Sequence, residues 1–438
     1  MIFSFDLLRA RKGDCFLLHF GTANKPGLVM VDGGPKSVYS PFLKPRLEQI
    51  KRARRLTPQE PLPVDVLMVS HVDDDHIQGL LDLTKEERVA VEAQQPRLLN
   101  VHSFWHNSFD AIIDHESGEV LASMKSQFGT AALSGAELSD QARAEVEAES
   151  SEPPDVVASN LKILASIEQG FRLREDAERL DFPRNSEFDG GLVVARENGQ
   201  EIPIGEELTF TVVGPMQPEL EALHKKHTQW LQDLKKEGKS PPAALASYID
   251  KSIPNLSSIV VLAEFGGKRM LLTGDARGDK ILEGLQLVGL LGRDQASTMH
   301  VDVLKVPHHG SANNLDRDFF DRILADHYVF SGDGEHGNPE REALEMLVHS
   351  RGDADYTLHF TYPIEEIDEE RKRDWNKEQA KEKARKNKNP GAKVRPNWSP
   401  KKHGLKALLA ESRDLLKRVL VTNDQDSHVI NLLDDVGI

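Results

Sequence analysis

The sequence contains a single cysteine, Cys15, and aromatic residues make up only 6% of the chain. One cysteine cannot form an internal disulfide, and a cysteine-rich zinc ribbon is excluded as well. No apolar run approaches the roughly 18 residues that span a membrane. The first residues also lack the apolar core and the cleavage site of a signal peptide. We therefore expect a cytoplasmic protein that has no membrane partner.

Charge is distributed unevenly along the 438 residues. The formal net charge is −16, which argues against a surface that is basic throughout. Segment 371–406 nevertheless holds fourteen Lys and Arg residues against three Asp and Glu residues, a local balance of +11. This segment is either a solvated, partly disordered loop or an arm that follows the phosphates of a polyanion.

Short apolar runs predict strands near both ends of the main body. The first 35 residues hold three such runs separated by turns, which is typical of an antiparallel meander. Strand character returns in 186–214 and in several runs between 258 and 333, whereas segment 110–250 is otherwise mostly polar and helical in pattern. Because many of these strands are joined by short links, an αββα sandwich fits the pattern better than a doubly wound parallel sheet.

The densest group of chemically active side chains is SHVDDDHIQG, which follows a buried strand at 64–71. Four candidate metal ligands fall within six residues: His71, Asp73, Asp75 and His76. Alternate residues of an extended chain share a face, so the first three can converge on one point, while His76 turns away as a helix begins. Imidazole and carboxylate groups are ligands for zinc, iron or manganese. A polar junction with solvated acids would not require so dense an array.

This segment resembles the His-x-His-x-Asp-His motif of the metallo-β-lactamase superfamily. Three other segments resemble landmarks of the same superfamily in the same order: VDGG at 31–34, LLTGDA at 271–276 and KVPHHGSANN at 305–314. The last of these, with the preceding strand pair, is closest to the competence-type (ComEC-like) metallo-hydrolase domains. The resemblance covers residues 1 to about 345, apart from the helical region.

The resemblance implies an α/β fold of the α+β kind, a four-layer αββα sandwich. The hydrolase domain would cover 1–345 with a helical insertion at about 110–250. Residues 346–438 would form a C-terminal extension that contains the basic segment.

The resemblance also implies roles for residues late in the domain. Asp275 would bridge two metal ions, although an aspartate in Thr-Gly-Asp can equally cap a turn. At least one of His308 and His309 would face the metals; since neighbours on an extended chain point in opposite directions, we do not expect equivalent roles. Gly310 and Ser311 would offer N–H and hydroxyl groups to a substrate oxyanion.

Two further positions are weaker candidates. His106 is the best choice for a third-motif ligand, with a packed core histidine as the alternative. Asp32, in VDGG, is expected to orient a ligand rather than to bind metal. Cys15 lies in an apolar strand, where an inert thiol is expected.

The chain departs from the superfamily pattern at two places. The second histidine of the first motif is Asp73, and an oxygen ligand there favours manganese or iron over zinc. The competence-type domains often carry Gly-His-Pro late in the fold, whereas this chain has Asn338 between Gly337 and Pro339, with His336 nearby as a possible substitute. Both His336 and Asn338 are therefore candidates for substrate binding.

The leading hypothesis is hydrolysis by a metal-activated water, with two divalent metal ions (zinc or manganese; iron possible). Asp75 would orient the water, and one of His308 and His309 would stabilise developing charge. The resemblance makes a phosphodiesterase or nuclease acting on nucleic acid or a nucleotide the first choice. The alternatives are a hydrolase of a small-molecule amide, lactone or thioester, or a degenerate module that binds a protein partner through the helical insertion or the C-terminal extension.

Overall fold

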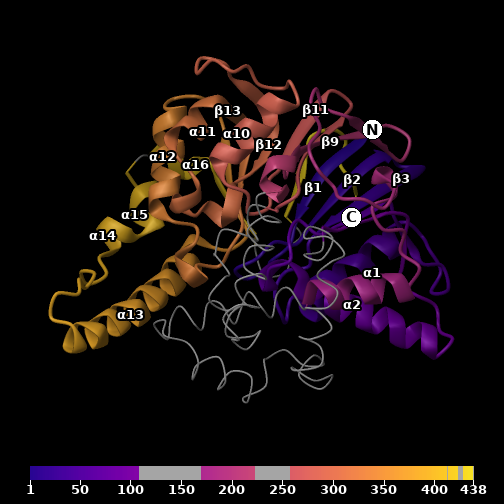
Figure 1. Ribbon diagram of the computed structural model, residues 1–438, viewed down its shortest axis with the longest axis horizontal. Coiled ribbons are helices and arrows are strands. Elements are labelled where there is room, and N and C mark those ends of the chain that lie inside the picture. Colours follow the sequence, from indigo (N-terminus) through magenta and orange to yellow (C-terminus); the bar gives the residue numbers. More distant parts are fainter. Residues whose placement is uncertain (108–168, 222–256, 412, 423–427, 438) are drawn as a thin grey trace, which may run out of the picture.

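Two β-sheets pack face to face, and helices cover their outer faces, in the computed structural model of the chain (Figure 1). The structure describes residues 1–107, 169–221, 257–411, 413–422 and 428–437. The predicted mixed α/β fold with four layers is confirmed.

The first sheet has six strands, and its centre is the meander predicted from the first 35 residues. Antiparallel pairing joins β1 to β2 and β2 to β3, whereas β5 and β7 run parallel to β3 and to each other. The spatial order is β16 (His428–Asn431), β1 (Ile2–Leu7), β2 (Phe16–Thr22), β3 (Lys25–Val31), β5 (Val66–Met68) and β7 (Phe104–Trp105). A separate parallel pair is formed by β4 (Leu62–Val64) and β6 (Leu99–Val101).

The second sheet has eight strands. Its strands from β11 to β15 are parallel, and β8 to β11 are antiparallel. The spatial order is β15 (Val419–Val421), β14 (Thr357–Phe360), β13 (Ile323–Phe330), β12 (Met299–Lys305), β11 (Lys268–Leu272), β10 (Val260–Phe265), β9 (Leu208–Gly214) and β8 (Glu201–Ile204). Strands β8 and β9 confirm the strand character predicted for 186–214.

Helices lie on the outside of both sheets (Figure 1). The first sheet is covered by α1 (Lys44–Ala53), α2 (Asp74–Glu92) and a helix at 169–179. The second sheet is covered by α10 (Gly278–Leu287), α11 (Arg317–Arg322), α12 (Arg341–Arg351), α15 (Leu405–Leu409) and α16 (Arg413–Lys417). Helices α13 (Ile364–Lys388) and α14 (Pro400–His403) project from the body at the lower left of Figure 1.

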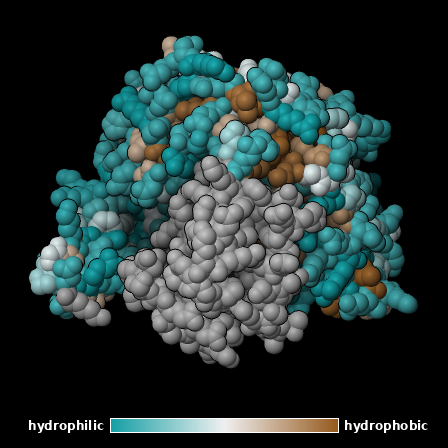
Figure 2. Space-filling model, in the orientation of Figure 1, coloured by the Kyte–Doolittle hydropathy of each residue, from teal (hydrophilic) through white to brown (hydrophobic). Residues whose placement is uncertain are grey.

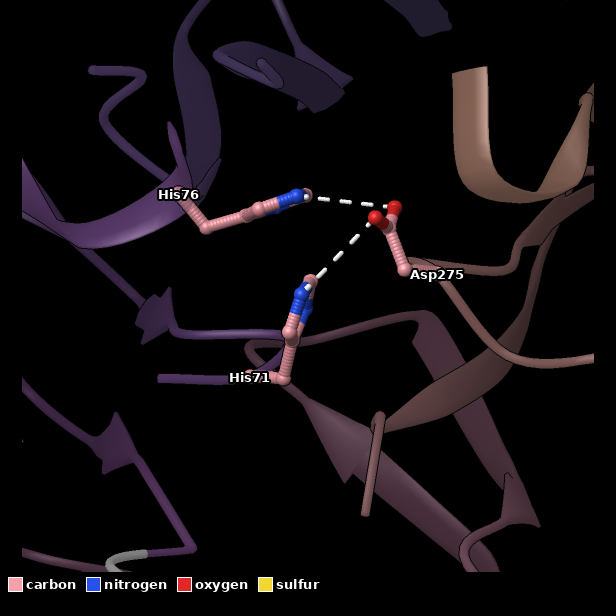
Figure 3. A group of neighbouring side chains, drawn as sticks. All are labelled: His71, His76 and Asp275. Atoms are coloured by element: carbon pink, nitrogen blue, oxygen red, sulfur yellow. Dashed lines mark ion pairs between the residues drawn. The ribbon is translucent and has the colours of Figure 1, made fainter. Parts of the chain in front are cut away.

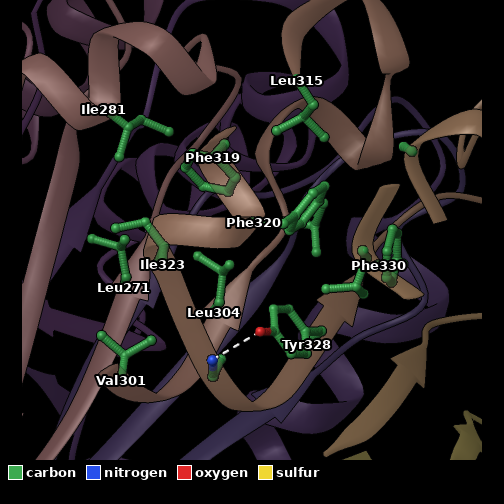
Figure 4. Packing of buried hydrophobic residues seen from close by; sticks show 14 of the residues in the cluster. Leu271, Ile281, Val301, Leu304, Leu315, Phe319, Phe320, Ile323, Tyr328 and Phe330 are labelled. Carbon is green, nitrogen blue, oxygen red and sulfur yellow. Dashed lines mark hydrogen bonds between the residues drawn. The ribbon is translucent and has the colours of Figure 1, made fainter. Parts of the chain in front are cut away.

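Three apolar clusters hold the layers together. The middle one lies between the sheets, where side chains such as Phe5 and Phe16 of the first sheet meet Phe210 and Met270 of the second. The largest lies beneath the helices of the second sheet, where alternate strand residues point outward (Figure 4). Burial of apolar area contributes about 25 cal/mol per Å², so these faces are the main source of stability.

Residues on both sides of the boundary expected at 345 and 346 belong to the same two sheets. Residues 108–168 and 222–256, most of the expected helical insertion, lie outside the described residues. The expected extension from residue 346 on adds β14 and β15 to the second sheet and β16 to the first. This segment therefore completes both sheets. Among the described residues, no helix is long and apolar enough to cross a membrane.

The VDGG segment forms a turn that anchors the start of α2. The backbone N–H of Gly33 donates to the carbonyl of His76 at 2.7 Å, and that of Gly79 donates to the carbonyl of Gly34 at 2.9 Å. A Cβ at Gly79 would lie 1.9 Å from the carbonyl oxygen of Gly33. Since no other residue allows this approach, the two glycines fix the position of His76 at the helix start.

Candidate metal centre

A cluster of histidines and aspartates forms where loops of both sheets meet. The first sheet contributes the turn between β1 and β2, the turn after β3 and the loop after β5, and the second contributes the segments after β11 and β12. These loops bring together seven residues that are distant in sequence: Asp14, Asp32, His71, His76, Asp275, His308 and His309.

Asp275 is the centre of this cluster. Its carboxylate follows β11 and is 4% exposed. Two imidazoles from the first sheet point toward it: Nε2 of His71 lies 3.8 Å from Oδ2, and Nε2 of His76 lies 3.5 Å from Oδ1 (Figure 3). From the other side, Nε2 of His308 and of His309 lie 3.6 Å and 3.3 Å from Oδ2. The carboxylate thus faces four imidazoles, and its role as a bridging ligand stays a prediction.

His76 is held by groups behind its ring. Its Nδ1 lies 2.8 Å from Oδ2 of Asp32 and 3.2 Å from Oγ of Ser70. Asp32 is in turn fixed by the backbone N–H and the hydroxyl of Ser70, which donate at 2.7 Å and 2.6 Å. A carboxylate on one ring nitrogen sets the tautomer and aims the other nitrogen at a metal. The structure therefore places Asp32 behind the ring of His76, and its role in orienting a metal ligand stays a prediction.

His308 and His309 do not point in opposite directions, as an extended chain would require. Both have left-handed backbones, with φ of 49° and 54°, within the short helix η4 (Pro307–Gly310). Non-glycine residues avoid this region, and its occurrence at consecutive residues costs about 1–3 kcal/mol each. The resulting turn brings both rings to Asp275, but the side chain of His309 is 3% exposed and that of His308 is 26% exposed, so their surroundings are not equivalent.

Asp73 and Asp75, the two aspartates of the first motif, lie at the rim of the cluster. Asp73 is the N-cap of α2, and its Oδ2 lies 3.7 Å from Nε2 of His71. Asp75 already belongs to the first helical turn, so it does not share an extended face with Asp73. Its oxygens lie 4.0 Å from Nε2 of His76 and of His309. With 22% and 29% of their side chains exposed, Asp75 and Asp73 line the solvent side of the cluster.

The donor atoms suit a divalent cation. Nε2 of His71, His76 and His309 and Oδ1 of Asp275 are buried without a hydrogen-bond partner. A buried polar atom without a partner costs about 1–3 kcal/mol, and here four such atoms converge. Within the described residues, His71, His76 and Asp275 offer ligand atoms within 4.8 Å of one another, as do Asp75, His76 and His309. Ligand atoms that share one zinc ion at about 2.0–2.1 Å are spaced in this range.

The electrostatics lead to the same conclusion. Burial raises the pKa of Asp275, but the imidazoles of His309, His308 and His76 lower it by more. The net result is a pKa well below the usual range of an aspartate. Burial lowers the pKa of His309, but Asp275 and Asp14 raise it to about 9. The cluster is therefore rich in negative charge and attracts protons to its imidazoles. A metal ion satisfies the same charge by displacing those protons.

Two residues of the centre were not predicted from the sequence. Asp14 is buried beside Lys305, whose Nζ lies 2.6 Å from its Oδ2, and its Oδ1 lies 3.2 Å from Nδ1 of His309. Lys305 also donates to the carbonyl of Gly274 at 2.8 Å and lies 3.6 Å from Asp275. Asp14 lies in the KGD turn before β2. Lys305 directly precedes the VPHHG motif, and this position was the one sequence signal that could have identified it.

The candidate for a third-motif ligand has a backbone carbonyl as its neighbour. His106 is buried at the carboxyl end of β7, next to β5, and its Nε2 lies 3.3 Å from the carbonyl oxygen of Gly170. It belongs to none of the groups of potential ligands found among the described residues. Its role as a third-motif ligand stays a prediction.

The candidate substrate-binding residues surround the η4 turn. Ser311 donates its hydroxyl to Glu340 at 3.3 Å, and Gly310, at φ 81°, packs against Phe330. His336 is half exposed, with its Nε2 3.3 Å from Nζ of Lys12. Asn338 lies nearby with its Oδ1 buried and without a partner. Their roles in substrate binding stay predictions.

Comparison with known proteins gives short or weak similarities. No family model matches the chain. Microtubule-associated protein 1A of Rattus norvegicus is 29% identical over 139 residues, which cover 32% of this chain and 5% of that protein. The Mus musculus protein of the same name is 36% identical over 78 residues, 18% of this chain and 3% of that protein. The matched stretches thus span a twentieth or less of these relatives.

Among solved structures, the chain is similar to zinc-bound PqqB from Methylobacterium extorquens. The sequence identity is 12% and the TM-score is 0.26, with 72% of this chain and 58% of that chain covered.

Proposed function

We propose that the protein is a metal-dependent hydrolase of the metallo-β-lactamase type. The observation that carries this proposal is the convergence of unpartnered imidazole nitrogens from both sheets on the buried carboxylate of Asp275. Divalent cations, when bound, supply Lewis acidity and a water with a pKa lowered toward about 7. His71, Asp73, Asp75, His76, Asp275 and His309 would hold two such ions.

The surrounding residues keep this site ready for a cation. Asp32 and Ser70 hold the ring of His76, and Ser331 (2.9 Å from Nδ1) and Asp14 hold the ring of His309. Lys305 offsets part of the negative charge of Asp14 and Asp275. A preorganised set of charges of this kind needs no rearrangement during a reaction, and in many enzymes such preorganisation accounts for most of the rate enhancement.

Two side chains at the solvent side would assist the proposed reaction. His308 is 26% exposed and still reaches Asp275, and Asp75 is 22% exposed. Burial lowers the pKa of His308, although Asp275 opposes this. In the proposed reaction Asp75 orients the attacking water, and His308 donates a proton to the leaving group. General acid–base help of this kind contributes about 10²–10⁴ in rate.

Phosphodiesters are the substrate class that we propose. The KVPHHGSANN segment resembles the competence-type domains, and the three carboxylates among the proposed ligands, Asp73, Asp75 and Asp275, favour hard cations that bind phosphate oxygens. Two ions about 3.5–4 Å apart suit in-line displacement at phosphorus.

A panel assay tests this choice. Metal-loaded protein should hydrolyse bis(p-nitrophenyl) phosphate in preference to chromogenic amide, lactone and thioester substrates. Asp275→Asn should reduce the activity by at least 10²-fold, whereas the exposed Asp279→Asn should not change it. Equal activity of both variants would refute the proposal. A preference for the amide, lactone or thioester substrates would mean that the substrate is one of these small molecules and not a phosphodiester.

A further inference from the structure

The basic segment is folded, so it is not the partly disordered loop that was one of the two alternatives expected from the sequence. Helix α13 is followed by residues 389–403, which run back along it, and we call residues 371–403 the basic hairpin. The indole of Trp375 donates to the carbonyl of Pro396 at 2.9 Å, and its ring stacks on His403 with centroids 4.3 Å apart. Gln379 donates to the carbonyl of Arg395 at 3.0 Å. These contacts fix both halves of the hairpin as one element.

Some cations of the hairpin serve its own packing. Arg371 is buried and donates to the carbonyl oxygens of Gly337 at 2.9 Å and of His403 at 2.8 Å. Arg395 pairs with Glu382 at 2.9 Å. These two arginines therefore do not belong to a surface for a partner.

Four other cations form a stripe along the outer face of α13. Arg373, Lys377, Lys381 and Arg385 are spaced by four residues and are exposed. Residues four apart lie on the same face of a helix, about 6 Å apart along its axis, so the stripe is about 18 Å long. Trp375 and Gln379 lie on the opposite face, which packs against the returning segment. We call these four residues the basic stripe.

The stripe is not explained by helix stability. Like charges four residues apart destabilise a helix by about 0.2–0.5 kcal/mol per pair. Glu370 and Glu378 pair with Arg373 and Lys381 at 2.6 Å, and Glu369 lies 4.0 Å from Arg373, but these pairs are exposed and therefore weak. Cations near a helix C-terminus are favourable only within the last turn, and Arg373, Lys377 and Lys381 precede it.

The root of the hairpin is connected with the metal centre through two hydrogen bonds. Arg371 binds the carbonyl of Gly337 in the short helix η6 (Glu335–Gly337). Three residues later, the backbone N–H of Glu340 donates at 2.9 Å to the carbonyl of Gly310, which directly follows His309. One side-chain and one backbone hydrogen bond thus connect α13 with the turn that carries His308 and His309. In Figure 1 helices α13 and α14 project at the lower left, and the surface there is largely hydrophilic in Figure 2.

We propose that the basic stripe binds the phosphate backbone of a nucleic acid strand and delivers it to the metal centre, an inference that rests on the proposed phosphodiester hydrolysis. On a chain of net charge −16, a polyanion is repelled by most of the surface and is drawn to this stripe. Binding through Lys and Arg side chains alone carries no sequence preference. A rigid element beside the site would hold the polymer beyond the scissile bond.

The test is a salt titration of binding by the full chain in EDTA, where no turnover occurs. The probe is a fluorescein-labelled 30-mer single strand. The slope of log K against log salt is about −0.7 per phosphate neutralised, so changing the four stripe residues to Gln should reduce its magnitude by about 3. A control that changes the exposed Lys25, Arg52, Arg317 and Lys417 to Gln has the same net charge and should leave the slope unchanged. A second control, Lys377→Arg with Lys381→Arg, should keep wild-type binding.

The outcomes separate this inference from the proposed function. Equal slopes for the stripe variant and the charge-matched control would overturn the stripe, whether or not the protein cleaves diesters. Displacement of the strand by poly-glutamate of equal charge at equal concentration would also overturn it, in favour of an acidic protein partner. Salt-dependent binding through the stripe without any diester cleavage by the metal-loaded protein would support the stripe and refute the proposed function instead.

Discussion

Oδ2 of Asp32 lies 2.8 Å from Nδ1 of His76, and this contact leaves Nε2 of the same ring directed at Asp275. The two residues come from the turn after β3 and the first turn of α2, so the position of a candidate ligand depends on how two elements dock. The Gly33–Gly79 approach makes that docking close.

This relationship predicts the effect of Asp32→Asn. The amide retains the shape of the side chain but loses the negative charge that fixes the imidazole, so we expect zinc affinity to fall by about 10–100-fold. Competition with a chromogenic chelator measures it. Asp279→Asn, at an exposed position of α10, is the control and should bind as the wild type does; the same affinity for both variants would show that Asp32 does not orient a ligand.

Asp73→His tests the departure from the superfamily motif. Asp73 lies 3.7 Å from His71, and replacing oxygen by nitrogen softens the site. We expect the ratio of zinc to manganese affinity to rise by at least tenfold, as measured by competitive titration. An unchanged ratio would mean that Asp73 is not a ligand.

Lys305→Met tests the charge balance of the centre. The buried ammonium group offsets Asp14 and Asp275, so its removal should destabilise the metal-free protein by about 3–5 kcal/mol. Because the ammonium group competes electrostatically with a cation, the same change should strengthen metal binding. Urea unfolding in EDTA and in excess zinc measures both effects. A loss of stability that is identical under the two conditions would contradict this explanation.

A second group of histidines predicts a dependence of stability on pH. His359 lies between His327 (3.0 Å) and His428 (2.8 Å), remote from the metal centre in sequence. Burial, followed by the neighbouring His428 and His327, lowers the pKa of His359 to about 2. The unfolded chain takes up a proton below pH 6.5 and the folded chain does not, so folding should lose about 1.4 kcal/mol per pH unit below that value.

The variant His359→Gln should remove this part of the pH dependence. Between pH 7 and pH 5 its free energy of unfolding should fall by about 2 kcal/mol less than that of the wild type. The exposed His349→Gln is the matched control and should follow the wild type. Parallel curves for all three proteins would show that His359 does not titrate in this way.

The residues near one another in sequence were the predictable part of the site. His71 to His76 could be recognised together because a strand, a turn and a helix start bring them to one place by local geometry. Asp14 could not, because its partners Lys305 and His309 are almost 300 residues away in the chain. The left-handed turn at His308 and His309 was also missed, since the sequence shows polar residues there but no glycine at those positions.

The same distinction applies to the fold. The meander of the first sheet follows from alternating apolar runs and was predicted. The basic hairpin was not distinguished from a loop, because its high charge suggests disorder. The contacts that stabilise it join residues distant in sequence: Trp375 with Pro396 and His403, and Arg371 with Gly337. The contribution of β14 to β16 to both sheets likewise depends on pairing with strands far away in the sequence.

Metal stoichiometry tests the central claim most directly. Protein dialysed against excess zinc or manganese and then freed of unbound ions should retain about two ions per chain by elemental analysis, and Asp75→Ala combined with His76→Ala should retain about one with the fold intact by circular dichroism. If the wild-type protein binds neither zinc nor manganese, even with a dissociation constant in the millimolar range, the account is contradicted.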